Sequence, residues 1–148
     1  MCALVLGEGR LRAKLERLVS REGVGDVVSF LGERSDVLSY IAMADLFVFS
    51  SVEEGLGTSL LDAMVMGVPT VATRAGGIPD LYGTVGSEWL VPPRDSKKLA
   101  EAVVSVLSDP GEAERRVRLG RERAALFSVP KMAEAYEGIY LSLLKDTT

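Results

Sequence analysis

The chain contains no histidine and a single cysteine, Cys2, among its 148 residues. One cysteine cannot form an internal disulfide, and without histidine it has no partner for a metal cluster. Neither a Cys–His nor a Ser–His catalytic pair can be built from these residues. We therefore expect no metal site, no resident cofactor and no catalytic residue that the sequence alone can name.

Long apolar runs and an excess of basic residues are also lacking. No run approaches the roughly 18 apolar residues that cross a bilayer, and no segment has the form of a signal peptide. The formal net charge is −4, whereas binding along a nucleic-acid backbone needs a concentrated basic surface. We expect a cytoplasmic protein without an integral membrane segment and without a nucleic-acid partner.

Size and composition predict one domain over residues 1–148. Hydrophobic residues make up 47% of the chain and charged residues 26%, which is typical of a globular protein. A chain of this length can bury one substantial core but not two.

Within that domain, short apolar runs alternate with segments of helical periodicity. The apolar runs predict buried strands, which lie at 3–6, 27–31, 46–49, 68–72 and 89–91. Apolar residues at helical spacing predict helices over 11–19, 37–44 and 58–66, the last of them closed by Gly67. Strands separated by helices indicate an α/β fold: a parallel, Rossmann-like sheet with helices on both faces.

The last third of the chain has a helical pattern that predicts a C-terminal helical tail. One apolar stripe runs from Leu99 to Leu107 and another from Met132 to Leu143. The charged stretch between them, 112–123, places Glu112 four residues before Arg116 and Glu114 four before Arg118. Interleaved charges of both signs favour a solvent-exposed helix over a basic patch for a membrane or a partner.

The most informative segment is the loop that follows the predicted strand 46–50. It reads Glu54-Gly55-Leu56-Gly57-Thr58, and Asp62 follows in the helix. Glycines let backbone amides approach a ligand, and a helix N-terminus favours negative charge. Two acids eight positions apart can then hold hydroxyls on either side of a phosphate. The pattern predicts a nucleotide-sugar site, in which Thr58 either caps the helix or donates its hydroxyl to a phosphate oxygen.

Together with Gly67-Val68-Pro69-Thr70-Val71-Ala72-Thr73, this segment resembles the donor-binding signature of family 4 (group 1) retaining glycosyltransferases of GT-B architecture. Glu54 matches the first acid of that family's E-x7-E motif, and Asp62 stands where the second Glu belongs. Further matches occur in the family's order along the chain: Gly7-Glu8-Gly9, Phe30-Leu31-Gly32, Asp36-Val37, Ala44-Asp45, Gly76-Gly77-Ile78-Pro79-Asp80 and Leu90-Val91-Pro92-Pro93-Arg94-Asp95.

The resemblance implies roles for particular residues. The Glu54 carboxylate would accept hydrogen bonds from donor-sugar hydroxyls, and Asp62 would bind the ribose diol on a shorter arm. Backbone amides of Gly55, Leu56 and Gly57 would face the sugar and the β-phosphate. The expected partner is a UDP-, GDP- or ADP-linked sugar.

Two earlier loops are assigned to the same ligand. By resemblance, Gly7 and Gly9 would line an interdomain cleft and face the donor phosphate. A dinucleotide-binding alternative for them is weak, because the third glycine of G-x-G-x-x-G is replaced by Arg12. Gly32 and Arg34 follow a strand at the carboxyl edge, where such sheets bind ligands, and would flank the base. An ordinary turn explains Gly32 and Arg34 nearly as well.

In the resembled family, the C-terminal donor domain opens with one further strand and helix, which carry an Arg and a Lys for the donor diphosphate. This chain begins at what resembles the second strand, so we expect an N-terminally truncated donor half. Transfer would then require an acceptor domain, and the chain alone would bind donor weakly without catalysing transfer. A homodimer or the missing N-terminal domain would cover the exposed strand edges. The alternative is a non-catalytic interaction module, with a nucleotide-sugar epimerase as a distant third.

Overall fold

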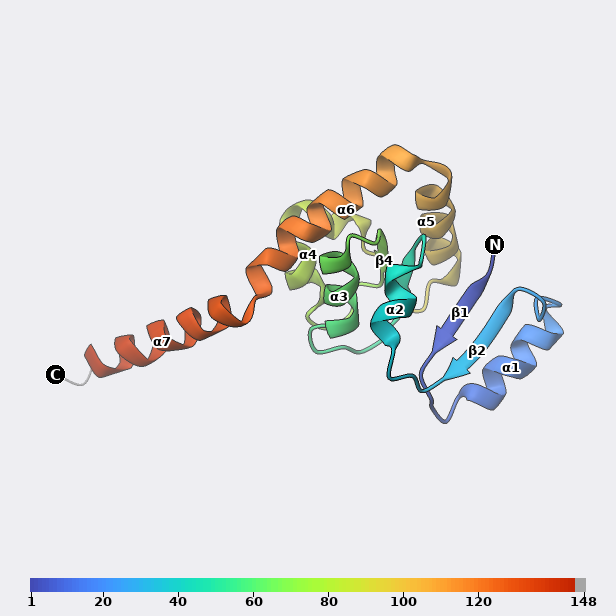
Figure 1. The fold of residues 1–148 in the computed structure, drawn as a ribbon, viewed down its shortest axis with the longest axis horizontal. Coiled ribbons are helices and arrows are strands. Elements are labelled where there is room, and N and C mark those ends of the chain that lie inside the picture. The colour runs from blue at the N-terminus through green and yellow to red at the C-terminus, as the bar shows by residue number, and fades with distance from the viewer. Residues whose placement is uncertain (146–148) are drawn as a thin grey trace. The chain divides into compact units, whose positions relative to one another are not determined.

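The computed structural model describes residues 1–145, and Figure 1 shows its helices and strands. The chain forms two compact units, residues 1–40 and the segment from Ile41 onward. Each unit is described by itself below.

The first unit is a βαβ arrangement. Strand β1 (Ala3–Leu6) pairs in parallel with β2 (Val28–Gly32), and helix α1 (Arg12–Arg21) connects them. Gly7 ends β1 with a φ of 109°, and its amide donates to the Gly32 carbonyl at 2.7 Å. The left-handed backbone of Gly32, with a φ of 71°, ends β2. The predicted strands and helix of this region are therefore confirmed, with boundaries that differ by one or two residues.

Helix α2 (Val37–Ala42) spans the point where the first unit gives way to the second. In the second unit, strand β3 (Phe47–Phe49) pairs in parallel with β4 (Thr70–Ala72), with Val48 opposite Val71. Helix α3 (Thr58–Met66) connects these strands, and α4 (Ile78–Gly86) follows β4. The remaining elements are helices: η1 (Ser87–Trp89), α5 (Ser96–Ser108), α6 (Pro110–Ala124), η2 (Ala125–Phe127) and α7 (Val129–Lys145).

The α/β class, the parallel pairing and the helical C-terminal tail are confirmed. The predicted strand at 89–91 is wrong. Trp89 ends the short helix η1, and Val91 alone makes a parallel bridge, with Thr73. Pro92 and Pro93 follow directly, and because proline has no N–H, the ladder cannot continue through them.

Helix α4 had no counterpart among the predicted elements. Its apolar residues Ile78, Leu81, Tyr82 and Val85 follow a helical spacing that could have revealed it. Gly83 interrupts the helix with φ 68° and ψ −172°, so two short helical turns meet at a kink. Such short turns give a weak periodic signal.

The core of the second unit lies between α3, α4, β4 and α6. Leu60, Val71, Ile78 and Leu81 have no exposed surface, and Met64 has 2%. Each fully buried aliphatic side chain contributes about 1.5–3 kcal/mol. Leu60 and Met64 belong to α3, the helix that follows the β3–α3 loop. The core therefore fixes the position of this helix and, with it, the end of the loop.

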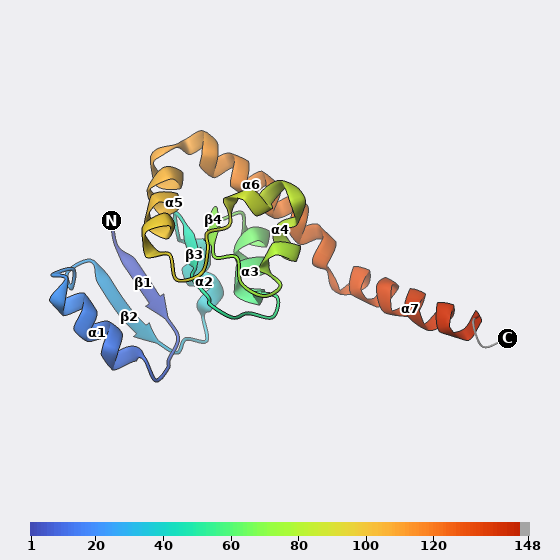
Figure 2. The same ribbon diagram turned by 180° about the vertical axis from the view of Figure 1, so that it is seen from behind.

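Helix α6 packs against α3, α4 and α5 (Figure 2), so one face of this helix is buried, while the prediction of solvent exposure holds for its other face. Arg116 is 7% exposed. Its Nη1 donates to the Thr70 carbonyl at 3.1 Å, its Nε donates to Glu112 at 2.8 Å, and its guanidinium lies 4.9 Å from the centre of the Trp89 ring. The predicted Glu112–Arg116 pair thus forms, but with both side chains largely buried.

Two small residues share the buried face of α6 with Arg116 and explain why the charge pattern was misleading. Arg116, Gly120 and Ala124 recur every four residues and are all buried. A Cβ on Gly120 would lie 3.2 Å from Met64 Cγ, so α6 and α3 approach closely there. No ion pair joins Glu114 to Arg118 within the described part of the chain.

Candidate functional site

The candidate site of the second unit is the loop of residues 50–57, between β3 and α3. The Glu54 side chain is half-buried in this loop. One carboxylate oxygen accepts the Gly55 amide at 3.0 Å, and the other accepts the Ser51 hydroxyl at 3.4 Å. A carboxylate offers about four acceptor positions, so the Glu54 carboxylate keeps room for hydrogen bonds from ligand hydroxyls.

The start of α3 depends on the backbone of Gly57. This residue is buried and left-handed, with φ 82° and ψ 61°, and it occupies the N-cap position. Its carbonyl accepts the amides of Leu60 and Leu61 at 3.0 and 3.1 Å. No side chain caps the helix, and Thr58 is the first helical residue. The capping interpretation of Thr58 is therefore wrong, while a ligand role for its exposed hydroxyl stays a prediction.

Several amides at this helix start are open. Those of Leu56, Gly57, Thr58 and Ser59 have no hydrogen-bond partner within residues 1–145. Unsatisfied amides at a helix N-terminus, together with the helix dipole, form an anion-binding arrangement. The Gly55 amide differs from this group, because it donates to the Glu54 carboxylate.

Asp62 lies one turn along α3, four residues after Thr58, so the two share a helix face. Leu60, Ala63 and Met64 occupy the buried side of the helix. The Asp62 carboxylate is half-buried and makes no hydrogen bond or ion pair with any described residue. It is therefore available to a ligand that reaches this face of α3.

The β4–α4 segment supports the loop from behind. A Cβ on Gly76, whose φ is 49°, would lie 1.6 Å from the Glu54 carbonyl oxygen, and one on Gly77 would lie 2.2 Å from the Gly55 carbonyl oxygen. The backbones touch directly, which only glycine permits at both positions. The sequence marked this Gly-Gly pair as part of a family pattern but did not connect it with Glu54.

The remaining four predicted residues belong to the first unit. Gly7 and Gly32 are joined by a backbone hydrogen bond, and a Cβ on Gly7 or Gly9 would meet nothing within 4 Å. A Cβ on Gly32 would lie 2.7 Å from a Glu8 carboxylate oxygen, so that side chain covers Gly32. The ten predicted residues thus form two groups, one in each unit.

The Arg34 guanidinium folds back onto its own segment. It donates to both carboxylate oxygens of Asp36 at 3.0 and 3.1 Å, and lies 5.4 Å from the centre of the Tyr40 ring. The hydrogen bond from Arg34 lowers the pKa of the exposed Asp36 carboxyl below its ordinary value. Arg34 is therefore held by its neighbours, and contact with a nucleotide base would require this pair to open.

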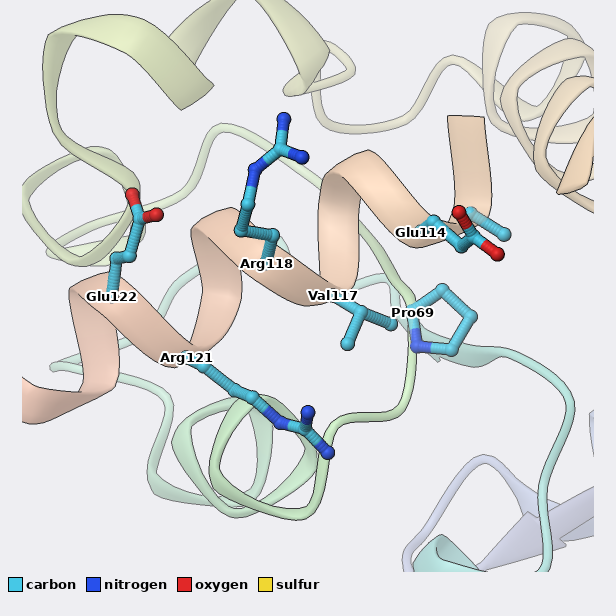
Figure 3. A pocket seen from close by; sticks show the side chains of 7 residues that line it. Pro69, Glu114, Val117, Arg118, Arg121 and Glu122 are labelled. Atoms are coloured by element: carbon cyan, nitrogen blue, oxygen red, sulfur yellow. The ribbon is translucent and has the colours of Figure 1, made fainter. Parts of the chain in front are cut away.

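A shallow depression of about 560 Å³ lies elsewhere in the second unit (Figure 3). Pro69 lines it together with side chains of α6, among them Val117, Arg118 and Arg121. Pro69 precedes β4, and its carbonyl accepts the Phe47 amide at the first residue of β3. The depression therefore lies at the amino end of these strands, whereas Glu54 follows the carboxyl end of β3. It is not part of the candidate site.

Residues 2–109 match the sequence profile of the glycosyl transferases group 1. The match covers well over half of the chain, which therefore belongs to this glycosyltransferase family. Its parallel strands with helices on both sides are those of a Rossmann-like half of a GT-B protein.

Two relatives illustrate the similarity in sequence. The chain is 33% identical to the N-acetyl-alpha-D-glucosaminyl L-malate synthase of Bacillus anthracis over 97% of its own length. It is 35% identical to the 2-deoxystreptamine glucosyltransferase of Streptomyces kanamyceticus over 80% of its length. The chain spans only 38% and 31% of the lengths of these two proteins.

Solved structures show the same relation. The Anabaena protein Alr3699/HepE, crystallised with UDP and glucose, matches 95% of this chain with a TM-score of 0.84 and 25% identity, and the chain covers 40% of it. The C-terminal domain of a group 1 glycosyl transferase, LpcC of Francisella tularensis, matches 85% of the chain with a TM-score of 0.74 and 25% identity. Here the chain covers 69% of the solved domain.

Within residues 1–145, no helix combines the length and the apolar character that a bilayer crossing requires.

Proposed function

We propose that this chain binds the donor nucleotide sugar of a group 1 glycosyltransferase. The observation that carries the proposal is the half-buried Glu54 carboxylate beside four open amides at the start of α3. One arrangement thus offers acceptors for sugar hydroxyls and donors for phosphate oxygens. The proposal is supported by the HepE complexes with UDP and with UDP-glucose, whose protein matches this chain with TM-scores of 0.85 and 0.83.

Each group has a distinct task in this proposal. The amides of Leu56, Gly57 and Thr58 bind the β-phosphate, where negative charge develops as the nucleoside diphosphate leaves the anomeric carbon. Glu54 orients the sugar through its hydroxyls, and Asp62 binds the ribose diol. In the first unit, the Gly9 amide, which is unpaired within residues 1–145, binds phosphate, and Gly7, whose own amide is hydrogen-bonded to Gly32, leaves space beside it. Gly32 and Arg34 flank the base.

Transfer also requires an acceptor hydroxyl to be brought to the anomeric carbon. The proposed site orients the donor and stabilises part of the leaving group, but none of its residues is assigned to the acceptor. We therefore propose that the chain does not catalyse transfer alone and acts with an acceptor-binding domain. A non-catalytic interaction module is the competing function, and it predicts no preference for any sugar nucleotide.

We also propose that a second copy or such a further domain covers apolar surface of the first unit. Leu4 and Val5 of β1 are 38% and 37% exposed, and Leu15 and Leu18 of α1 are 40% and 41% exposed. Several exposed aliphatic side chains on one unit are a feature of surfaces that bind another protein.

Ligand-observed NMR with UDP-glucose, GDP-mannose and ADP-glucose, each beside its free nucleoside diphosphate, tests the donor site. We expect one sugar nucleotide to bind more tightly than its nucleotide. Because a hydrogen bond to a charged group is worth about 1.5–3 kcal/mol, Glu54→Ala should weaken that binding about 10- to 150-fold.

Glu53→Ala is the matched control, since Glu53 is an exposed carboxylate one position earlier and makes no hydrogen bond or ion pair with the described residues. It should leave the affinity unchanged. If the wild-type chain binds none of the sugar nucleotides or nucleoside diphosphates, the result contradicts the proposal and favours the interaction module.

A further inference from the structure

We infer that Thr73 is a positioning residue for the donor sugar, because its hydroxyl fixes the segment that carries Glu54. This inference rests on the proposed function. Thr73 directly follows β4 and is 3% exposed. It lies 19 positions from Glu54 in the sequence, at the end of the segment 67–73, to which no ligand contact has been assigned.

The contacts of Thr73 reach the beginning of the loop. Its Oγ1 donates to the Ser51 carbonyl at 2.5 Å, and its amide donates to the Phe49 carbonyl at 3.0 Å. The loop therefore leaves β3 along a path that Thr73 fixes at the carbonyls of Phe49 and Ser51. Ser51 in turn donates its hydroxyl to the Glu54 carboxylate at 3.4 Å. Two hydrogen bonds, both through Ser51, thus connect Thr73 with Glu54, the residue proposed to bind the sugar.

A second set of contacts fixes the other end of the loop. The Gly77 amide donates to the Gly55 carbonyl at 2.8 Å and lies 3.4 Å from the Glu54 carbonyl. Gly55 then donates its own amide to the Glu54 carboxylate at 3.0 Å. The Glu54 carboxylate thus accepts hydrogen bonds from Ser51 and from Gly55. The backbone of Ser51 is fixed by Thr73, and the backbone of Gly55 is fixed by Gly77. Loss of the Thr73 hydroxyl releases one of these two backbones.

The inference differs from a purely structural role in what it predicts for the ligand. The Thr73 hydroxyl donates into the loop and not into the apolar core, so its removal changes where Glu54 lies more than how well the core packs. Glu54 contacts the sugar in the proposed function, whereas the open amides of α3 contact the phosphate. Thr73 should therefore affect the sugar part of the affinity and leave the nucleotide part unchanged.

The test measures the affinities of Thr73→Val and Thr73→Ser for UDP-glucose and for UDP. Valine keeps the shape of threonine without its hydroxyl, and serine keeps the hydroxyl. One neutral hydrogen bond corresponds to about a two- to tenfold change. We expect Thr73→Val to weaken UDP-glucose binding by that factor with UDP binding unchanged, and Thr73→Ser to bind both as the wild type does.

Thr70→Val is the matched control, because Thr70 is 2% exposed at the first residue of β4, and its hydroxyl bonds to Tyr82 and not to the loop. It should lower stability without changing the ratio of the two affinities. The inference is overturned if Thr73→Val binds UDP-glucose as tightly as the wild type, or loses UDP and UDP-glucose affinity equally.

Amide hydrogen exchange of the ligand-free chain separates this inference from the proposed function. We expect the Gly55 and Gly77 amides to exchange about tenfold faster in Thr73→Val and at the wild-type rate in Thr73→Ser. Unchanged protection in Thr73→Val overturns the positioning role whatever binds. If the wild-type chain binds neither UDP-glucose nor UDP while protection falls as expected, the proposed function fails and the positioning of Glu54 by Thr73 stands.

If Thr73→Val does not fold, Ser51→Ala is the second variant. It removes the hydrogen bond from the Ser51 hydroxyl to the Glu54 carboxylate at a half-exposed position. It should reduce the preference for UDP-glucose over UDP by a similar factor. An unchanged preference in Ser51→Ala contradicts the inference.

Discussion

Arg94 has a φ of 65°, and it is the one residue other than glycine within 1–145 whose φ is positive. The left-handed conformation costs an ordinary L-residue about 1–2 kcal/mol. Arg94 directly precedes Asp95, whose side chain caps α5 through the Lys98 amide at 3.0 Å. The turn is therefore fixed by the start of the next helix, and Arg94 adopts the conformation that the turn requires.

Arg94→Gly should stabilise the chain by about 0.5–1 kcal/mol, because glycine relieves the strain while losing more backbone entropy on folding. Thermal unfolding would show this as a rise of a few degrees in Tm. Arg94→Ala is the control, since alanine removes the side chain but keeps the backbone strain. An equal rise in Arg94→Ala would contradict the strain argument.

Gly76 leads to a prediction of the opposite sign. Gly76→Ala would place a Cβ 1.6 Å from the Glu54 carbonyl oxygen, so the loop must move. We expect a loss of more than about 1 kcal/mol in unfolding free energy and weaker binding of the donor that the wild type prefers. Gly138→Ala is the control: nothing lies within 4 Å of its added Cβ, and it should raise helix stability by up to about 1 kcal/mol. A Gly76→Ala variant of wild-type stability would contradict the close approach.

At the scale of elements, a buried hydrogen bond joins α4 to β4. The Tyr82 hydroxyl lies 2.7 Å from Thr70 Oγ1, and Tyr82 is 3% exposed. Burial raises the pKa of Tyr82 to about 12 from the ordinary value of 10.0. An unfolded chain therefore releases this proton at lower pH than the folded chain does.

The resulting stability is present below pH 10 and is lost as the pH rises through about 12. The shift corresponds to about 3 kcal/mol. Urea unfolding at pH 9 to 12 should show this loss, and Tyr82→Phe should show a smaller one because it has no proton to release. A wild-type chain whose unfolding free energy changes no more steeply than that of Tyr82→Phe would contradict the assignment.

The elements also differ in how well the sequence predicted them. Helix α3 begins at Thr58 and ends at Met66 as predicted, and Gly67 is left-handed at its C-cap. Its periodicity and its terminal glycine are local signals. The buried face of α6 was not predicted, because Arg116 is stabilised by the Thr70 carbonyl, 46 residues earlier. Local charge patterns contain no information on such a partner.

The same distinction applies to the candidate site. Glu54, Thr58 and Asp62 follow one another within a single loop and helix, so a motif could assign them. Thr73 is inferred to position Glu54 through the Ser51 carbonyl, 22 residues earlier. Every residue has a backbone carbonyl, so the sequence cannot indicate which one accepts this hydrogen bond. The ligand roles of the ten predicted residues stay predictions until a donor is bound.

At the scale of the whole molecule, exposed apolar side chains predict association. Besides those of the first unit, Met132, Tyr136, Ile139 and Tyr140 of α7 are 54–64% exposed. Each unit holds one two-stranded sheet, and strand edges without a partner favour pairing with another chain. We expect multi-angle light scattering at tens of micromolar to report a dimer.

Leu15→Asp should shift the equilibrium toward monomer if the first unit forms the contact, and Ile139→Asp should do so if α7 forms it. Lys14→Asp is the control, since it adds the same carboxylate at an exposed polar position of α1. A wild-type chain that stays monomeric at this concentration would contradict a homodimer and leave a further domain as the proposed cover.

The direct backbone contact between Gly76 and Glu54 also bears on how this binding site could change during evolution or engineering. The side of the loop that faces the β4–α4 turn has no space for any side chain, so substitutions there are excluded. Leu56 and Thr58, in contrast, are exposed, so their side chains can vary with little effect on packing. A library for altered sugar preference should therefore randomise positions 56 and 58 and keep 76 and 77 as glycine.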